Sequence, residues 1–82
     1  MAHQFISDHP EQLKGIWFKP NGRRYCTWMF DHSTSTLLAK RGTVTRATKI
    51  EKPLSADELK STLPKLALDL SHNDEAAEHV TH

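Results

Sequence analysis

The sequence predicts an α+β domain in which a small antiparallel sheet of three to four strands, arranged as a meander, precedes a C-terminal helix. Two observations predict this fold class. Between Leu13 and Lys52, short runs of apolar and β-branched residues alternate with polar ones and are separated by turn residues, which is typical of half-buried strands. Leu59, Leu63, Leu66 and Leu70 instead recur at the three- and four-residue spacing of a helix.

Size and composition limit the class of protein. The chain has 82 residues, enough for a single domain. Its one cysteine excludes an internal disulfide and a Cys-rich metal site, and it suits a reducing compartment. The first ten residues lack the features of a signal peptide, and no apolar run approaches the roughly 20 residues that span a bilayer. We therefore expect a cytoplasmic protein without membrane contact; because so small a core is marginal, a homodimer is an open alternative.

The first two strands are predicted over residues 13–19 and 23–31, on either side of a tight turn. Pro20 has no N–H to donate, so it is a poor last residue for a paired strand. We expect Pro20 and Asn21 at the centre of a type I turn, with Gly22 in the left-handed position of a bulge.

This turn sets an expected register for the hairpin. Trp17 then pairs with Tyr25, and both lie on a partly solvent-exposed face together with Leu13. The opposite, more apolar face is expected to be buried, and it carries Ile16, Phe18, Arg24, Cys26, Trp28 and Phe30. A slip of one residue would exchange the two faces.

The remaining strands are weaker predictions. Residues 1–12 form a lead-in, in which Phe5 and Ile6 either make an edge strand or pack on the core. Residues 37–40 predict a short third strand that ends at a turn. The β-branched and partly alternating residues 43–52 predict the next strand.

The helix has a clear predicted start. Ser55 and Glu58 have the spacing of a capping box, in which each side chain bonds to the other's amide. Pro64 removes a helical N–H and crowds the preceding turn, so we expect a kink or split near residues 60–63. Residues 71–82 are acidic with few large apolar side chains, and they are predicted to be a flexible tail outside a domain of residues 1–70.

Charge is distributed unevenly along the chain. Residues 1–52 contain nine Lys and Arg against four Asp and Glu, whereas residues 53–82 contain two against six. One interpretation is a basic sheet that meets a polyanion while the acidic end is turned away. The other is two solvated surfaces that attract each other within one domain.

No motif indicates catalysis or a cofactor. The three isolated glycines cannot form a known phosphate-binding loop, and the six histidines lack a zinc-peptidase spacing. Asp31-His32-Ser33 brings triad residue types together only in sequence, whereas a triad is defined by spatial geometry. Cys26 is expected to be a buried structural thiol. We expect no enzyme, no cofactor and no metal site.

The candidate site is the set of basic and aromatic residues on the two hairpins. Lys and Arg suit phosphate contacts, and exposed aromatic rings suit stacking on unpaired bases. The leading hypothesis is a non-catalytic nucleic-acid-binding or regulatory protein that recognises DNA or RNA. The alternative is a protein-binding inhibitor or adaptor, such as mobile elements encode, with the same patch as its interface. The simplest other explanation of the basic residues is that charges at strand edges block aggregation. The site residues are Trp17, Lys19, Arg23, Arg24, Tyr25, Lys40, Arg41 and Arg46.

Overall fold

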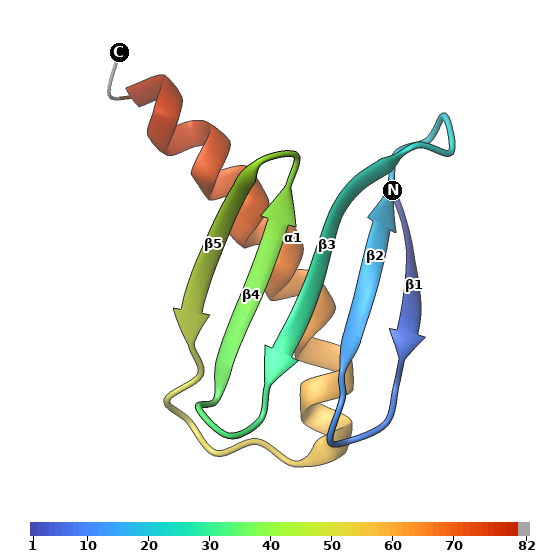
Figure 1. Ribbon diagram of the computed structural model, residues 1–82, viewed down its shortest axis with the longest axis vertical. Helices are drawn as coiled ribbons and strands as arrows, with labels where there is room; N and C mark the ends of the chain where they lie inside the picture. Colours follow the sequence, from blue (N-terminus) through green and yellow to red (C-terminus); the bar gives the residue numbers. More distant parts are fainter. Residues whose placement is uncertain (81–82) are drawn as a thin grey trace.

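The computed structural model describes the backbone of residues 1–80 and the side chains of residues 1–72. Five antiparallel strands form one sheet in the order of the chain, and a single helix follows (Figure 1). The elements are β1 (Ala2–Ser7), β2 (Lys14–Phe18), β3 (Arg24–Asp31), β4 (Thr36–Arg41), β5 (Val44–Lys49) and α1 (Ala56–Val80). The α+β meander is confirmed, but the predicted three to four strands are too few.

The additional strand is β1, which lies at the edge of the sheet and pairs with β2. It contains Phe5 and Ile6, for which an edge strand was one of two expectations. His3 and Phe5 are half-buried, and their neighbours Gln4 and Ile6 are exposed. This alternation shows that β1 contributes one face to the core.

The β2–β3 turn has the expected conformation. The Gly22 amide donates to the Lys19 carbonyl at 2.9 Å, and the Lys19 amide donates to the Arg23 carbonyl at 2.7 Å. Gly22 has a φ of 86°, the left-handed region that glycine adopts without strain. The type I turn with a glycine bulge is therefore confirmed.

The predicted pairing beyond this turn is wrong. Phe18 pairs with Arg24 and Trp17 pairs with Cys26, so Tyr25 is an extra residue on β3. This bulge shifts the register by one and exchanges the two faces of β2. Leu13 and Trp17, expected on the exposed side, therefore face the helix, whereas Ile16 and Phe18 face away from it.

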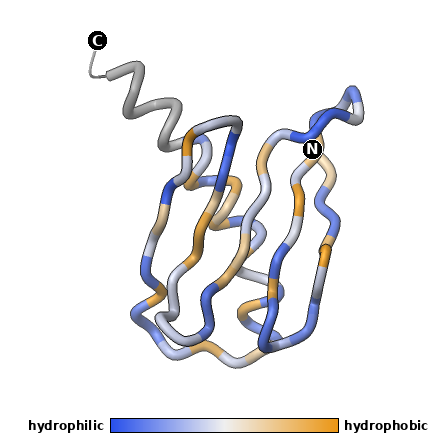
Figure 2. Tube along the Cα trace, viewed as in Figure 1, coloured by the Kyte–Doolittle hydropathy of each residue, from blue (hydrophilic) through white to orange (hydrophobic). Residues whose placement is uncertain are grey.

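The core lies between one face of the sheet and α1, which packs on β3, β4 and β5 and crosses behind the sheet (Figure 1). Figure 2 shows apolar residues recurring along the central strands, whereas the β2–β3 turn is hydrophilic. The buried apolar side chains are Leu13, Cys26, Trp28, Phe30, Leu37 and Ala39 from the sheet side, and Leu59, Leu63 and Ala67 from α1.

The start of α1 agrees with the predicted capping box. The Glu58 amide donates to Ser55 Oγ at 3.2 Å, and the Ser55 amide donates to Glu58 Oε1 at 3.1 Å. The helix then continues through Pro64 to Val80 without interruption. The expected split is absent over this described range, and a kink is not confirmed. Leu59 and Leu63 on one side of the proline and Ala67 on the other all pack on the sheet, which offsets the hydrogen bond that Pro64 cannot donate.

The region predicted to be a tail begins inside this helix. Ser71 is buried, and the side chain of His72 contacts Tyr25 of the sheet. The flexibility of the rest stays a prediction, because the side chains of residues 73–80 and all of residues 81–82 lie outside the described part of the chain. Among the described residues, no helix combines the length and apolar composition needed to cross a bilayer.

Candidate functional site

Two hairpin turns lie at the same end of the sheet, because every connection in this meander reverses the chain. The β2–β3 turn and the β4–β5 turn therefore lie at the same end of the sheet although they are distant in sequence (Figure 1). We call this end of the sheet the basic end, because both hairpins place cationic residues there. Its cations are Lys19, Arg23 and Arg24 from the first hairpin and Lys40 and Arg41 from the second.

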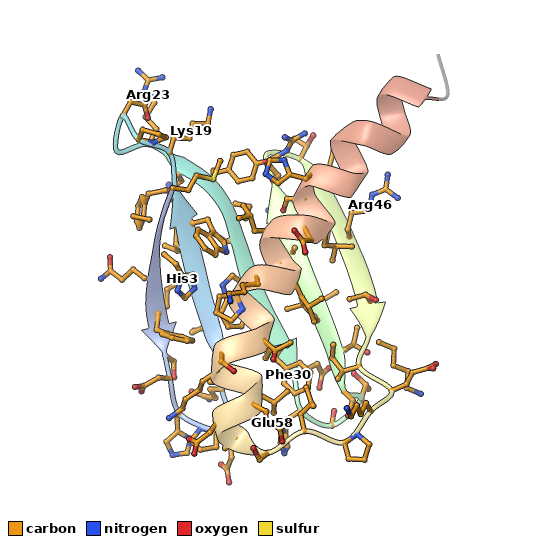
Figure 3. The ribbon with its side chains drawn as sticks, turned by 180° about the vertical axis from the view of Figure 1, so that it is seen from behind. His3, Lys19, Arg23, Phe30, Arg46 and Glu58 are labelled. Carbon is orange, nitrogen blue, oxygen red and sulfur yellow. The ribbon has the colours of Figure 1, made fainter. Side chains whose placement is uncertain are left out.

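The first hairpin contributes three exposed cations. Lys19 and Arg23 flank the tip, and Figure 3 shows both side chains directed away from the body of the sheet. The Arg23 amide donates to Asn21 Oδ1 at 3.0 Å, which stabilises the backbone of the tip. Arg24 is the first residue of β3 and is also exposed. These three side chains are thus available to solvent on a hydrogen-bonded turn.

Two shallow hollows join the hairpins across the gap between β3 and β4. One has a volume of about 430 Å³, and its lining includes Lys19, Arg24 and Arg41. The other has a volume of about 300 Å³, and Arg24 and Lys40 contribute to its lining. Tyr25 and Gly42 line both hollows. The structure therefore brings cations from separate hairpins around one concave surface, which suits an anion.

Tyr25 connects the basic end to the rest of the fold. Arg41 Nη1 donates to Tyr25 Oη at 3.3 Å, and the guanidinium carbon lies 5.5 Å from the centre of the ring, a cation–π arrangement. On the other side, Tyr25 Oη lies 3.3 Å from Nδ1 of His72 on α1. The bulge at Tyr25 thus turns its ring toward β4 and the helix, and the ring positions Arg41.

Two of the sequence-predicted site residues lie elsewhere. Trp17 is half-buried, and its Nε1 donates to the Pro64 carbonyl of α1 at 2.7 Å. Arg46 lies on β5 opposite Ala39, so it is on the helix side of the sheet; Figure 3 shows it well away from Lys19 and Arg23. The predicted surface pair of Trp17 and Tyr25 is therefore not formed.

An aromatic cluster beneath the helix was missed by the sequence analysis. Trp28 Nε1 donates to His3 Nε2 at 3.0 Å, so His3 must be unprotonated on that nitrogen. The His3 ring also lies near the rings of Phe5 and Trp17, with centroids 4.8 and 5.0 Å away. Burial lowers the pKa of His3. No local signal marks this contact, because it requires β1 to pair in one particular register.

The bond between His3 and Trp28 crosses β2 at Gly15. A β-carbon at position 15 would lie 2.5 Å from His3 Nε2 and 2.8 Å from Trp28 Nε1. Both distances are well below van der Waals contact. Only glycine therefore leaves room for this hydrogen bond.

The remaining chemically reactive groups have structural environments. Cys26 is buried, and burial raises the pKa of its thiol, although the Ser71 hydroxyl and the Arg41 guanidinium oppose the shift. Asp31 Oδ1 accepts from the Ser33 amide at 3.0 Å and from Ser33 Oγ at 2.7 Å, and these bonds lower the pKa of Asp31. The Asp31-His32-Ser33 sequence therefore forms a hydrogen-bonded turn.

Neither a metal site nor a relative provides further information on function. Within the part of the chain that the structure describes, no three His, Cys, Asp or Glu side chains are grouped to hold a metal ion. Comparisons with protein families, with curated proteins and with solved structures found no match to this chain.

Proposed function

We propose that this chain is a small, non-catalytic, cytoplasmic nucleic-acid-binding protein that contacts the phosphate backbone through its basic end. One observation carries the proposal: cations from two separate hairpins, Lys19, Arg24 and Arg41, line one hollow. Phosphates are regularly spaced along a nucleic acid, so cations that converge on a short surface can neutralise more than one of them.

The bulge at Tyr25 favours contact with phosphates over stacking on bases. Trp17 contacts Pro64 under the helix, and the Tyr25 ring lies against Arg41 and His72. Neither ring forms the exposed pair that base stacking requires. The basic end therefore supports phosphate contact, which carries no sequence information by itself.

The same geometry weakens the alternative of a protein interface at this patch. Interface hot spots are aromatic and Arg side chains that become desolvated against a partner. Trp17 is the aromatic residue expected to anchor such an interface. Its indole N–H instead donates to the Pro64 carbonyl of α1, so this group is not available to a partner.

The test is a titration of fluorescent duplex DNA, single-stranded DNA and single-stranded RNA at several salt concentrations. We expect the double variant Arg23→Ala/Arg24→Ala to bind more weakly than the native chain. The logarithm of its affinity should also depend less steeply on salt, by about 0.7–0.9 for each phosphate that the variant no longer neutralises.

The matched control is Lys52→Ala/Lys65→Ala, which removes the same charge from exposed positions outside the basic end. Lys52 lies in the connection between β5 and α1, at the opposite end of the sheet (Figure 1). The control should retain most of the affinity and the salt slope. Equal losses in the two variants would indicate a non-localised charge effect, and no loss in either would remove the basic end from the function.

A further inference from the structure

The sheet has a second face, directed away from α1, that no described residue covers. The helix packs on β3, β4 and β5 from one side only, as Figures 1 and 3 show from opposite directions. Because side chains alternate along a strand, the neighbours of buried residues point to this uncovered side. We call it the open face.

An apolar row crosses the open face. Met29 of β3 pairs with Leu38 of β4, which pairs with Ala47 of β5. Ile16 of β2 points to the same side two residues from the row, and Ile6 extends the apolar surface to β1. Met29 is 49% exposed and Ile6 is 53% exposed. Single exposed apolar residues are ordinary, but a connected row across several strands is typical of an interaction surface.

Cations flank this row. Lys14 pairs with Met29 from the β2 side, and Lys40 and Lys49 lie two residues from Leu38 and Ala47 along their own strands. Asp31 also belongs to this face and keeps its negative charge, because the hydrogen bonds that Oδ1 accepts from Ser33 lower its pKa, but the three lysines outnumber it. The open face is thus an apolar stripe with a positively charged margin.

The lysines and the aliphatic row together indicate which kind of partner the open face would bind. Two copies packed through their open faces would bring lysines from both chains into one desolvated layer, which is unfavourable. Nucleic acid is also a poor match, because stacking of bases requires aromatic rings and Phe18 is the one aromatic residue of the described strands on this face. Aliphatic and thioether side chains instead match the apolar side chains of a protein.

We propose that the open face binds an acidic amphipathic helix of another protein, whose apolar side chains cover the row from Met29 to Ala47 and whose carboxylates meet Lys14, Lys40 and Lys49. A helix suits this surface because α1 covers the opposite face of the same sheet in that way. Neighbouring strands are about 4.8 Å apart, so the row from Met29 to Ala47 across β3–β5 spans about 10 Å, which corresponds to roughly two helical turns. Lys40 belongs both to this surface and to the basic end, whereas Met29, Leu38 and Ala47 lie outside the basic end. The binding therefore adds a protein partner to the proposed function at a surface that adjoins the basic end.

The test is selection from a displayed library of helical peptides of about 15 residues, a length at which isolated helices begin to form. The native chain is the target. We expect enriched peptides to carry apolar residues at positions i, i+3 or i+4 and i+7, with an excess of Asp and Glu beside them. The affinity of a synthetic copy of the most enriched peptide is then measured by titration.

Met29→Glu places a negative charge, which repels an acidic peptide, at the exposed β3 end of the apolar row. It should weaken the enriched peptide at least about tenfold, as expected for a desolvated interface residue. Ala47→Glu is a second variant in the same row, so a folding defect in one does not decide the result. Ser61→Glu adds the same charge at an exposed position on α1 and should leave the affinity unchanged.

Several results would overturn this inference. Enrichment of no peptide, enrichment without excess acidic residues, or equal binding by Met29→Glu would each do so. If sedimentation shows a native dimer that Met29→Glu dissociates, the occupant is a second copy. If Met29→Glu abolishes binding of single-stranded RNA, the open face is part of a nucleic-acid site.

Discussion

Replacing Gly15 with Ala tests whether the close approach of three strands determines the stability of the aromatic cluster. The added Cβ would lie 2.5 Å from His3 Nε2 and 2.8 Å from Trp28 Nε1, so the hydrogen bond between them cannot keep its geometry. Gln4 contributes a third obstacle, since its backbone oxygen would lie 3.0 Å away. We expect Gly15→Ala to displace β1 from β2.

The magnitude follows from the burial of Trp28, which is 3% exposed. A buried donor that loses its acceptor costs about 1–3 kcal/mol, whereas a Gly→Ala change gains about 0.4–1 kcal/mol by restricting the unfolded chain. The net loss in the free energy of unfolding is therefore about 0–2.6 kcal/mol, with a central value of about 1.3 kcal/mol. For a domain of this size the central value lowers Tm by roughly 5–10 °C.

The assay is urea denaturation followed by far-ultraviolet circular dichroism, with the indole N–H resonance of Trp28 as a local readout. In a His3→Ala background one obstructing group is absent, so Gly15→Ala should cost less there. The control is Gly42→Ala, which has a φ of 63° and open space around it, so it should cost the same in both backgrounds. Equal costs of Gly15→Ala in the two backgrounds, or an unmoved Trp28 resonance, would refute the reasoning.

Three further predictions concern the same core. Burial lowers the pKa of His3 below its ordinary value, so the folded state favours the neutral ring. The contribution of His3 to the free energy of unfolding should therefore be complete above the unfolded pKa of about 6.5 and should fall as the pH drops below it. Chemical denaturation between pH 5 and 8 measures this dependence, and a His3→Gln variant that keeps the whole of it would contradict the assignment. Trp17→Phe should lower the free energy of unfolding by about 0.5–1.5 kcal/mol, because it removes the hydrogen bond from the indole N–H to the Pro64 carbonyl; an unchanged urea midpoint would be inconsistent with that bond. Ser71→Ala should preserve or raise Tm, since Ser71 Oγ is buried and its contact with the weakly hydrogen-bonding Cys26 thiol lacks hydrogen-bond geometry. A clear fall in calorimetric Tm would show that the hydroxyl has a stabilising partner.

Local interactions explain the parts of the fold that the sequence predicts correctly. The turn at Gly22 and the cap of α1 by Ser55 and Glu58 each involve residues within about four positions of one another. Their geometry depends on fixed backbone preferences, on a missing proline donor and on short side-chain reach. These features do not require knowledge of what the elements pack against.

The sequence also determined the residues of the basic end, although it did not determine their arrangement. Alternate turns of a meander lie at the same end of the sheet, and Arg24 and Arg41 belong to two such turns. Their placement around one hollow depends on the bulge at Tyr25, which turns that ring under Arg41. A bulge forms where the packing of a whole sheet face favours it, and no local signal in β3 specifies one.

The same bulge decided which side of β2 is buried. Both faces of β2 carry apolar residues, so alternation alone cannot choose between Trp17 and Phe18. Trp17 faces inward because α1 provides the Pro64 carbonyl for its indole N–H and because Gly15 makes room for His3 on that side. Likewise, α1 passes through Pro64 because residues on both sides of it pack on the sheet. These outcomes depend on contacts between residues far apart in the chain, which only the tertiary structure brings together.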